Sequence, residues 1–387
     1  MKKVVGLAAA GLLGVSAANA GQITVANTDI TLFGGVSAGY NLQDNDHQLR
    51  SKISPKGFEK DSFSVNNVII GLTKPAQDGG IGFTAAFGSW EAPTVVASSK
   101  VVNGKGLIGY GDSTTFKPWL AYVTYKPVAG LTLDAGLLWS QFGEKPVTIL
   151  NPHITRGVLF TANPALMAGA RGTYDFGVAK VYVGAGKVGD QLMKPVFEGK
   201  ASALGNGYAK SYMEAGVTAN LKQFGLPADV GLHTYNEAGG RDIYALTAGT
   251  DLGMVSLGVE VDYFVADKNL KNYSNGTKKY DSNAWGAALC ANIKPMAGVQ
   301  IPVRIEYADT KKSILIPTIA AENTINKTPE KNSVWTFTIT PTYNPTKNTF
   351  LRAEVSYVGS DKKIFINTSG KEKSSRTTGA VELGFLF

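Results

Sequence analysis

Three histidines are the residues best able to do acid–base chemistry in this chain, and they lie far apart, at His47, His153 and His233. His47 has Asp44 and Asp46 close by, a grouping that could form a general base or part of a metal site. Charged neighbours in a polar loop are common, however, so a hydrated loop is the stronger interpretation. The sequence has no H-E-x-x-H and no C-x-x-C motif. We therefore expect no catalytic residue, no metal and no cofactor, and we do not expect an enzyme.

Most of the remaining charge alternates with apolar residues over segments of roughly ten residues. A strand sends successive side chains to opposite faces, so each segment predicts one apolar and one charged face. We interpret the charged face as the wall of a lumen, where opposing charges could orient polar solutes. Hydration and pairing with neighbours would explain any single residue as well. The expected lumen-facing residues are Asp134, Arg171, Lys180, Glu214, Glu260, Asp262, Arg304, Glu306, Arg352, Glu354 and Glu382.

The last seven residues alternate in the same way and end in aromatic side chains. Val381, Leu383, Phe385 and Phe387 share one face of the predicted strand. Such a strand closes a bacterial outer-membrane barrel, with apolar side chains toward lipid and aromatics at the membrane interface. We predict that Phe385 and Phe387 form the signal read by the outer-membrane assembly machinery.

The N-terminus has the features of a secretory signal peptide. Lys2 and Lys3 precede an apolar run over residues 4–15, and Ala18-Asn19-Ala20 is an A-x-A cleavage site. We expect residues 1–20 to be removed after Ala20, and residues 21–387 to form a single exported domain. After the signal peptide, no apolar run approaches the ~18–20 residues that a transmembrane helix needs.

Turn-forming residues divide the chain into predicted strands. Seven short links contain Pro or Gly, at 74–80, 126–130, 175–177, 224–227, 251–253, 294–298 and 344–348. Longer polar segments alternate with them, at 42–61, 91–115, 142–165, 189–209, 236–241, 267–282, 311–331 and 361–375. This rhythm predicts an all-β, transmembrane antiparallel β-barrel of about 16 strands, with short periplasmic turns and long extracellular loops. The number would change by two if 91–110 hides a further hairpin.

Composition agrees with export. Cys290 is the only cysteine, which excludes an intramolecular disulfide framework. The net charge of +8 becomes +6 when Lys2 and Lys3 are removed with the signal peptide. A basic balance can indicate nucleic-acid binding, but an exported protein rarely meets nucleic acid. Basic loops facing anionic lipopolysaccharide, or a pore that favours anions, explain the charge better.

Several strand–turn–strand stretches carry a family resemblance. They are residues 61–75, 80–88, 121–127 and 130–136, with Gly143-Glu144 and the segment 151–157. These stretches, in roughly the first half of the exported chain, resemble the "putative beta-barrel porin-2, OmpL-like" family of outer-membrane porins. The resemblance implies a passive outer-membrane channel for small hydrophilic solutes. It supplies no ligand residues and no oligomeric state, so a homotrimer stays open.

The third long loop, residues 142–165, is the candidate constriction. In general porins this loop folds into the lumen and narrows it. The same arrangement here would make Glu144, Lys145, His153 and Arg156 the constriction residues. A loop that packs on the barrel rim is an equally good alternative.

The leading functional hypothesis is a water-filled porin that lets small ions and metabolites diffuse without a cofactor. A channel specific for anions, sugars or peptides would instead show a saturable binding site. A barrel enzyme would need clustered histidines, serines and carboxylates, and a structural barrel would need a plugged lumen. The expected partners are outer-membrane lipid and lipopolysaccharide, the assembly machinery and small solutes.

Overall fold

The computed structural model describes the chain in segments. Among these described residues, no helix is long and apolar enough to cross a membrane. The segments are 23–24, 29–44, 46–47, 61–90, 93–95, 101–102, 105–106, 113–141, 143, 148–160, 162–164, 166–187, 211–238, 241–266, 283–311, 321–323, 328–367 and 371–387. The predicted signal peptide lies outside them.

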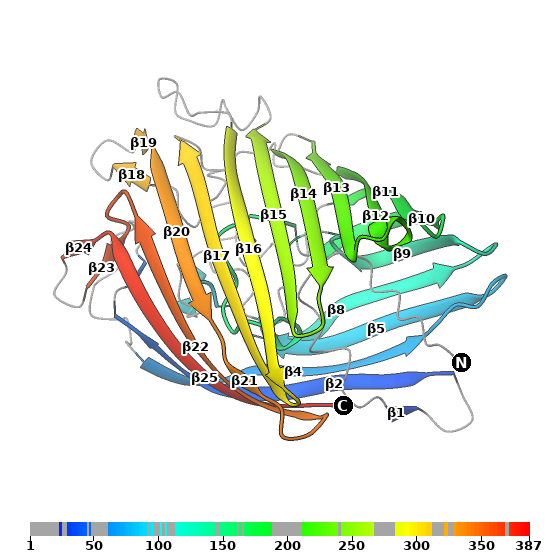
Figure 1. Cartoon of the computed structure of the whole chain (residues 1–387), viewed down its shortest axis with the longest axis horizontal. Coiled ribbons are helices and arrows are strands. Elements are labelled where there is room, and N and C mark those ends of the chain that lie inside the picture. Colours follow the sequence, from blue (N-terminus) through cyan, green and yellow to red (C-terminus); the bar gives the residue numbers. More distant parts are fainter. Residues whose placement is uncertain are drawn as a thin grey trace.

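Sixteen strands, each antiparallel to its neighbours, close into a barrel (Figure 1). One of them is interrupted at Thr340 and Pro341, so that β21 continues β20. In order round the barrel they are β2 (Thr31–Gln43), β4 (Asp61–Lys74), β5 (Ile81–Trp90), β8 (Ser113–Tyr125), β9 (Leu131–Trp139), β10 (Leu166–Asp175), β11 (Ala179–Lys187), β12 (Tyr212–Asn220), β13 (Ala228–Glu237), β14 (Arg241–Asp251), β15 (Val255–Ala266), β16 (Asn283–Met296), β17 (Val299–Lys311), β20 (Asn332–Ile339) with β21 (Thr342–Tyr343), β22 (Thr349–Ser360) and β25 (Ser375–Leu386). The predicted number of strands is confirmed.

Several short helices and strands lie outside the sixteen barrel strands. Two 3₁₀ helices, η3 (Thr148–Leu150) and η5 (Leu221–Phe224), follow β9 and β12. The remaining strands are β1 (Ile23–Thr24), which pairs with β2, and three small sheets: β3 (Asp46–His47) with β23 (Phe365–Ile366) and β24 (Glu372–Lys373), β6 (Val101–Val102) with β7 (Lys105–Gly106), and β18 (Ala321–Asn323) with β19 (Thr328–Glu330). The pair β6–β7 is a hairpin inside 91–110, but it stays outside the barrel sheet.

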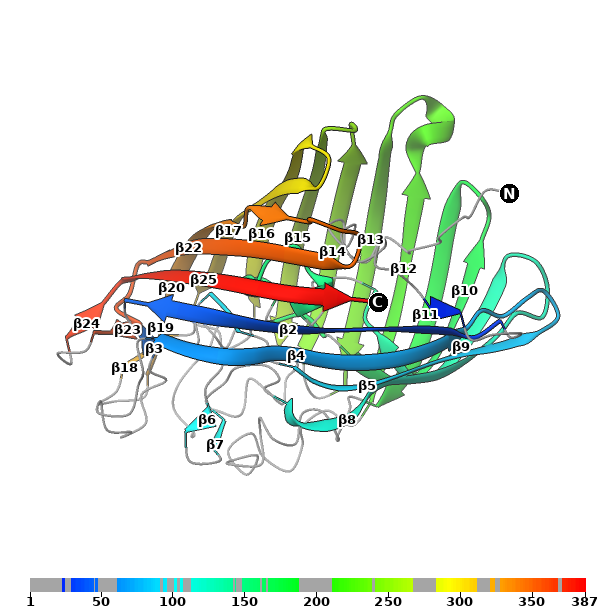
Figure 2. The same ribbon diagram turned by 90° about the horizontal axis from the view of Figure 1, so that it is seen from below.

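The first and last barrel strands close the ring (Figure 2). In the β2–β25 pair Val36 lies opposite Phe385. The terminal residue completes the ladder, because the Phe387 N–H donates to Gly34 O at 3.0 Å and the Gly34 N–H donates to Phe387 O at 2.9 Å. Closure leaves no unpaired edge, which a strand in lipid could not tolerate.

All seven predicted short links join consecutive strands at one end of the barrel. Their tightest examples need glycine: Gly253 and Gly298 follow the strands β14 and β16 with φ of 84° and 76°. The segment 236–241, predicted as a longer loop, is wrong in length, because β13 ends at Glu237 and β14 begins at Arg241. The pairing of the two strands runs from Ala228 with Thr250 to Asn236 with Asp242, so few residues separate them.

Alternation assigns the two faces of the wall. In β22 the side chains of Leu351 and Val355 are exposed, whereas those of Arg352 and Glu354 are buried. The same order holds in β25, where Leu383 is exposed and Glu382 is buried. The apolar face therefore points outward and the charged face inward, which suits a wall surrounded by lipid.

Candidate functional site

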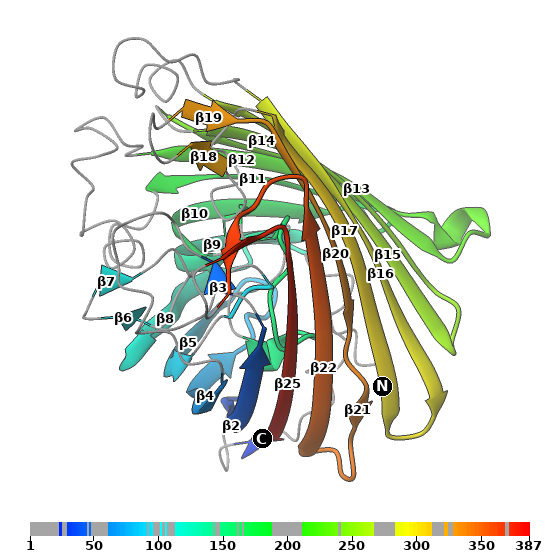
Figure 3. The same ribbon diagram turned by 90° about the vertical axis from the view of Figure 1, so that its left-hand side faces the viewer.

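The third long loop, between β9 and β10, folds into the barrel and crosses it. Its residues hydrogen-bond to inward-facing side chains of β15, β17 and β22, and to Thr340, which directly follows β20. Round the ring of sixteen, β17 and β20 lie opposite β9 and β10, and Figure 3 shows β9 and β17 on opposite sides. We call the inner faces of β15, β17, β20 and β22 the loop-bearing wall.

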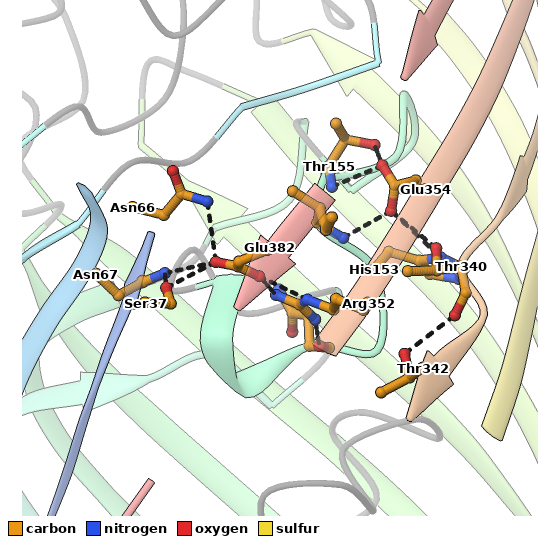
Figure 4. Close-up of polar contacts among 12 residues, drawn as sticks. Ser37, Asn66, Asn67, His153, Thr155, Thr340, Thr342, Arg352, Glu354 and Glu382 are labelled. Carbon is orange, nitrogen blue, oxygen red and sulfur yellow. Dashed lines mark hydrogen bonds and ion pairs between the residues drawn. The ribbon is translucent and has the colours of Figure 1, made fainter. Parts of the chain in front are cut away.

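Glu354 on β22 holds the first part of the loop. Its carboxylate accepts the backbone N–H of Ile154 at 2.6 Å and that of Thr155 at 3.0 Å (Figure 4). The Thr340 hydroxyl donates to the same carboxylate at 2.8 Å. Glu354 and Thr340 are both buried, so these charge-assisted hydrogen bonds are shielded from water.

Glu306 on β17 repeats the arrangement four residues further along the loop. It accepts the backbone N–H groups of Val158 and Leu159, each at 3.1 Å, and the hydroxyl of Thr336 at 2.8 Å. Gly157 makes the approach possible, because a Cβ atom there would lie 2.1 Å from Glu306 Oε1. Two wall carboxylates thus each capture two consecutive loop amides.

Two arginines bind loop carbonyls from the same wall. Arg352 donates to Asn151 O at 2.7 Å, and Arg304 donates to Thr155 O at 3.0 Å. Arg304 also lies 3.3 Å from Glu306 in an ion pair. All these groups are buried, so each charged side chain requires hydrogen-bonding or ionic partners. The loop backbone provides some of them through its carbonyl and N–H groups.

Glu382 on β25 gathers polar groups from three further strands (Figure 4). It accepts Arg352 Nε at 2.6 Å, Ser37 Oγ at 2.7 Å and Asn66 Nδ2 at 3.0 Å. Asn66 reaches it because β4 carries a bulge between the partners of Ser37 and Ala38, which turns two consecutive asparagines inward. Sequence alternation gives no signal for this bulge.

The far end of the loop is held by β15. Asn163 Nδ2 donates to Glu260 Oε1 at 2.9 Å and to Asp262 Oδ2 at 2.8 Å. Gly143, with a φ of 77°, packs against the Asn163 side chain, where a Cβ would come within 2.9 Å. The two ends of the loop therefore meet beside these two carboxyls.

His153 sits inside this arrangement rather than in open water. It is 1% exposed, and its Nδ1 lies 2.7 Å from the Thr340 hydroxyl. Burial lowers the pKa of the His153 imidazole well below its ordinary value, and the charges of Arg304 and Arg352 lower it further. His153 is therefore neutral at neutral pH, although Glu354 lies only 3.8 Å away.

The four predicted constriction residues fall into two groups. His153 and Arg156 are both fully buried on the loop, and Arg156 donates to Phe160 O at 2.6 Å. The backbone of Arg156 also pairs with the preceding long loop, through bonds to Pro93 and Val95. Glu144 and Lys145 lie outside the described residues. His153 and Arg156 thus pack the loop in place, and the constriction role stays a prediction.

The eleven predicted lumen residues all occupy positions on the inner side of the strand alternation. Six of them touch the loop directly, and Glu382 does so through Arg352, as described above. The others pair along the wall: Arg171 lies 3.4 Å from Glu214, Asp134 accepts the Thr124 hydroxyl at 2.6 Å, and Lys180 lies 3.4 Å from Asp175.

A second wall, the inner faces of β10–β13, is built differently. Glu214 and His233 lie flat against the sheet over Gly184 and Gly216, where added Cβ atoms would come within 2.7 and 2.8 Å of their side chains. Each glycine is the direct cross-strand partner of the residue above it. His233 also lies 3.0 Å from the Tyr182 hydroxyl. We call this surface the glycine-backed wall.

An apolar cluster inside the barrel was not anticipated. Leu159 and Phe160 of the loop pack with Ile243, Phe264 and Ala284, which point inward from β14, β15 and β16. Apolar residues at inward positions of three successive strands were the available signal. The loop is therefore fixed by hydrophobic contact as well as by its hydrogen bonds.

Two motif-like stretches in the sequence have no catalytic setting. Gly35-Val-Ser-Ala-Gly39 has the spacing G-x-S-x-G, but Ser37 lies within β2 and not at a strand-to-helix turn. Its hydroxyl donates to Glu382 and accepts from Asn67 at 2.8 Å. The G-x-G-x-x-G spacing from Gly184 begins within β11. In the part of the chain that the structure describes, no group of three or more His, Cys, Asp and Glu could hold a metal.

Comparison with protein families matches residues 29–387 to the "putative beta-barrel porin-2, OmpL-like" family. The chain belongs to this family. It is accordingly an outer-membrane channel protein. The match extends the predicted resemblance from the first half of the exported chain to its last residue.

Solved structures of other outer-membrane proteins share the fold. The outer membrane channel DcaP of Acinetobacter baumannii is 15% identical, with a TM-score of 0.58 over 95% of this chain and 100% of that one. The anion-selective porin from Comamonas acidovorans is 14% identical, with a TM-score of 0.52 over 92% and 99%. The trimer form of OmpT from Vibrio cholerae is 10% identical, with a TM-score of 0.56 over 92% and 99%. Curated protein sequences gave no match.

Proposed function

We propose that this protein is a passive, water-filled diffusion channel for small hydrophilic solutes and ions, whose narrowest part is set by the third loop. The observation that carries the proposal is the pair of wall carboxylates, Glu306 and Glu354, that bind four loop amides inside the barrel. Sixteen strands enclose more space than wall side chains fill, so a loop fixed against one wall leaves a passage beside it. Diffusion through such a passage needs no cofactor and no catalysis.

Single-channel recording of the refolded protein in a planar bilayer tests this proposal. Stable current steps proportional to voltage are expected. The size cut-off is measured by adding uncharged polymers of increasing length and finding the length that no longer lowers the conductance. A protein that is folded, as shown by its heat-shifted band on a gel, yet gives no current steps would overturn the proposal.

The constriction itself is proposed to include Glu144 and Lys145, which carry opposite charges. Single cysteines at these positions should react with a bulky thiol reagent and lower the conductance by more than half. The wild-type protein is the control, because its only cysteine, Cys290, is buried. Full reaction without any change in conductance would place these residues away from the narrowest point.

We propose a preference for anions, because the exported chain keeps a net charge of +6 after loss of Lys2 and Lys3. The inner-wall charges described above are largely paired, so we expect the lysines of the loop segments to dominate the field. A salt gradient across the bilayer gives the sign of the reversal potential. A reversal potential that indicates cation preference would reject this part of the proposal and leave the open channel intact.

Processing and assembly complete the proposal. We propose cleavage after Ala20, recognition of Phe385 and Phe387 by the assembly machinery, contact with lipopolysaccharide, and association as a homotrimer like the trimer form of OmpT. N-terminal sequencing of the protein from outer membranes should begin at Gly21. Deleting Phe387 should lower the amount of folded barrel in the membrane, and mass measurement in mild detergent gives the number of copies.

A further inference from the structure

A groove crosses the outer face of β8–β12 on the lipid side of the barrel. Its floor follows a row of cross-strand partners, Val123, Ala135, Ala170, Ala185 and Met213, one from each strand. All five side chains are exposed on the outer face. Three alanines in the middle of the row leave a trough of about 490 Å³ between larger neighbours.

On β10 the small side chains continue on both sides of this floor. Ala168 and Gly172 flank Ala170 on β10, so that strand carries three small outward residues in succession. On the side of the floor nearer the short turns, the rim is formed by larger residues, including Tyr125, Leu133 and Val183. Outward positions on β17 and β22 show no such run, since they carry Ile305, Tyr307, Leu351 and Val355.

Lys187 lies beside the groove, one row from its floor, on the side opposite Leu133 and Val183. It is exposed, points outward like Ala185 two residues before it, and pairs with Ala168. Two residues along a strand span ~7 Å, so its ammonium group can reach the edge of the trough beside Ala185. Because β11 runs away from the short turn after β10, Lys187 lies at the end of the wall where the long loops emerge. In an outer-membrane barrel that end meets the extracellular leaflet.

We propose that this groove binds one acyl chain of a phosphorylated lipid of the extracellular leaflet, with Lys187 at the phosphate. The groove lies in the hydrocarbon layer, so leaving it unfilled would forfeit contacts along three strands. Its volume is in the range of sites that hold one small ligand. A second barrel would need to bury ~800 Å² of each partner, which a trough one or two residues wide does not offer. The lysine supplies charge complementarity at the boundary where lipid phosphates lie.

Native mass spectrometry of the refolded protein in an uncharged detergent tests the proposal, with diphosphoryl lipid A and dephosphorylated lipid A as the added lipids. One bound lipid A per barrel is expected. Ala170→Phe fills the trough and should weaken binding at least about tenfold. Lys187→Gln should weaken binding of the phosphorylated lipid about fivefold and leave that of the dephosphorylated lipid unchanged. Ala353→Phe is the matched control, because Ala353 is an exposed outward alanine on β22.

The outcomes separate the possible occupants. Equal binding by Ala170→Phe, Ala353→Phe and the wild type would overturn the proposal. A wild-type mass of two or three copies that Ala170→Phe reduces to one would also overturn it, because a second copy would then occupy the groove. If Ala170→Phe does not fold, Ala135→Leu replaces it. Conductance is measured on the same samples, so a failure of the channel proposal is seen independently of lipid binding.

Discussion

The loop-bearing wall and the glycine-backed wall start from the same sequence pattern and use it in opposite ways. On the first, Glu306 and Glu354 reach inward and bind amides of a loop that comes from across the barrel. On the second, Glu214 lies flat over Gly184 and pairs with Arg171 on the next strand but one. The difference shows that alternating charge alone does not define a pore lining.

The cross-strand neighbour separates the two cases. Glu214 and His233 have glycines directly opposite on the adjacent strand, which give their side chains room to lie down. Glu306 and Arg304 have Thr336 and Thr338 opposite, whose Cβ branches keep the side chains directed inward. At these four positions an inward glycine accompanies a side chain that lies on the sheet, and an inward threonine accompanies one that reaches the loop. Asp262 departs from this pattern, because it binds the loop although Gly286 lies opposite it.

The largest effect is expected where a buried charge loses its partner on the loop-bearing side. Arg352→Ala leaves Glu382 buried without its guanidinium and also frees the Asn151 carbonyl. We expect a loss of about 3–5 kcal/mol in the free energy of unfolding, measured by denaturant titration in lipid micelles. The double variant with Glu382→Gln should recover part of the loss. A loss below ~1 kcal/mol for Arg352→Ala alone would show that the wall does not depend on this pair.

The outer face of the same wall offers the next test. Phe337 on β20 is exposed between the buried Thr336 and Thr338. Phe337→Arg places a charge in lipid and should cost about 2–4 kcal/mol near the midplane of the bilayer. Denaturant titration in lipid vesicles measures the loss, and Phe337→Leu serves as the control. Unchanged stability of the arginine variant would reverse the assignment of faces on which the comparison rests.

Glu354→Gln sharpens the contrast between the walls. A glutamine presents an NH₂ group where the carboxylate accepted the amides of Ile154 and Thr155. Each hydrogen bond to a charged group contributes about 1.5–3 kcal/mol, so the loop should loosen. Single-channel recordings should show larger current noise. Glu214→Gln is the matched change on the glycine-backed wall and should leave the noise unaltered; equal noise in both variants would erase the distinction.

The pH dependence of stability tests the packing of the loop. His153 has a pKa below its ordinary value of about 6.5 in the folded protein, so the unfolded state binds more protons once the pH falls below that value. The contribution of His153 to the free energy of unfolding is therefore fully present above pH ~6.5. As the pH falls below ~6.5, this contribution should decrease by at most about 1.4 kcal/mol per pH unit. Denaturant titration between pH 5 and 8, compared with His153→Asn, isolates the contribution. Identical pH profiles would place the imidazole in water.

The smallest effect is expected at Lys180, near the short-turn end of the glycine-backed wall. Its ammonium group lies 3.4 Å from Asp175, and the Lys180 side chain is 38% exposed. Lys180→Ala should change the free energy of unfolding by ~0.2–1 kcal/mol, since solvent screens such a pair. Denaturant titration of Lys180→Ala and Arg352→Ala under the same conditions compares the losses in the free energy of unfolding on the two walls. A loss as large as that of Arg352→Ala would show that this pair, too, is essential.

Much of the fold was readable from local sequence. Period-two alternation in segments such as 131–139 and 351–357 marked the strands and their two faces, because side-chain direction along a strand is fixed by the backbone itself. Pro and Gly marked the turns, as at Gly253 and Gly298, because tight turns need backbone angles that few residues adopt. The number of strands and the inward position of the charged residues followed from these two signals.

The tertiary structure alone decided what those inward residues do. Glu354 binds Thr155 and Glu306 binds Val158 although the partners are 199 and 148 residues apart, and no periodicity connects them. The bulge that turns Asn66 toward Glu382 likewise breaks the local pattern instead of following it. The sequence alone determined that this protein is a sixteen-stranded outer-membrane barrel, because strand faces and turns are local properties of the backbone. Which wall carries the loop was decided by closure of the ring, because only closure brings residues so distant in the chain within hydrogen-bonding distance.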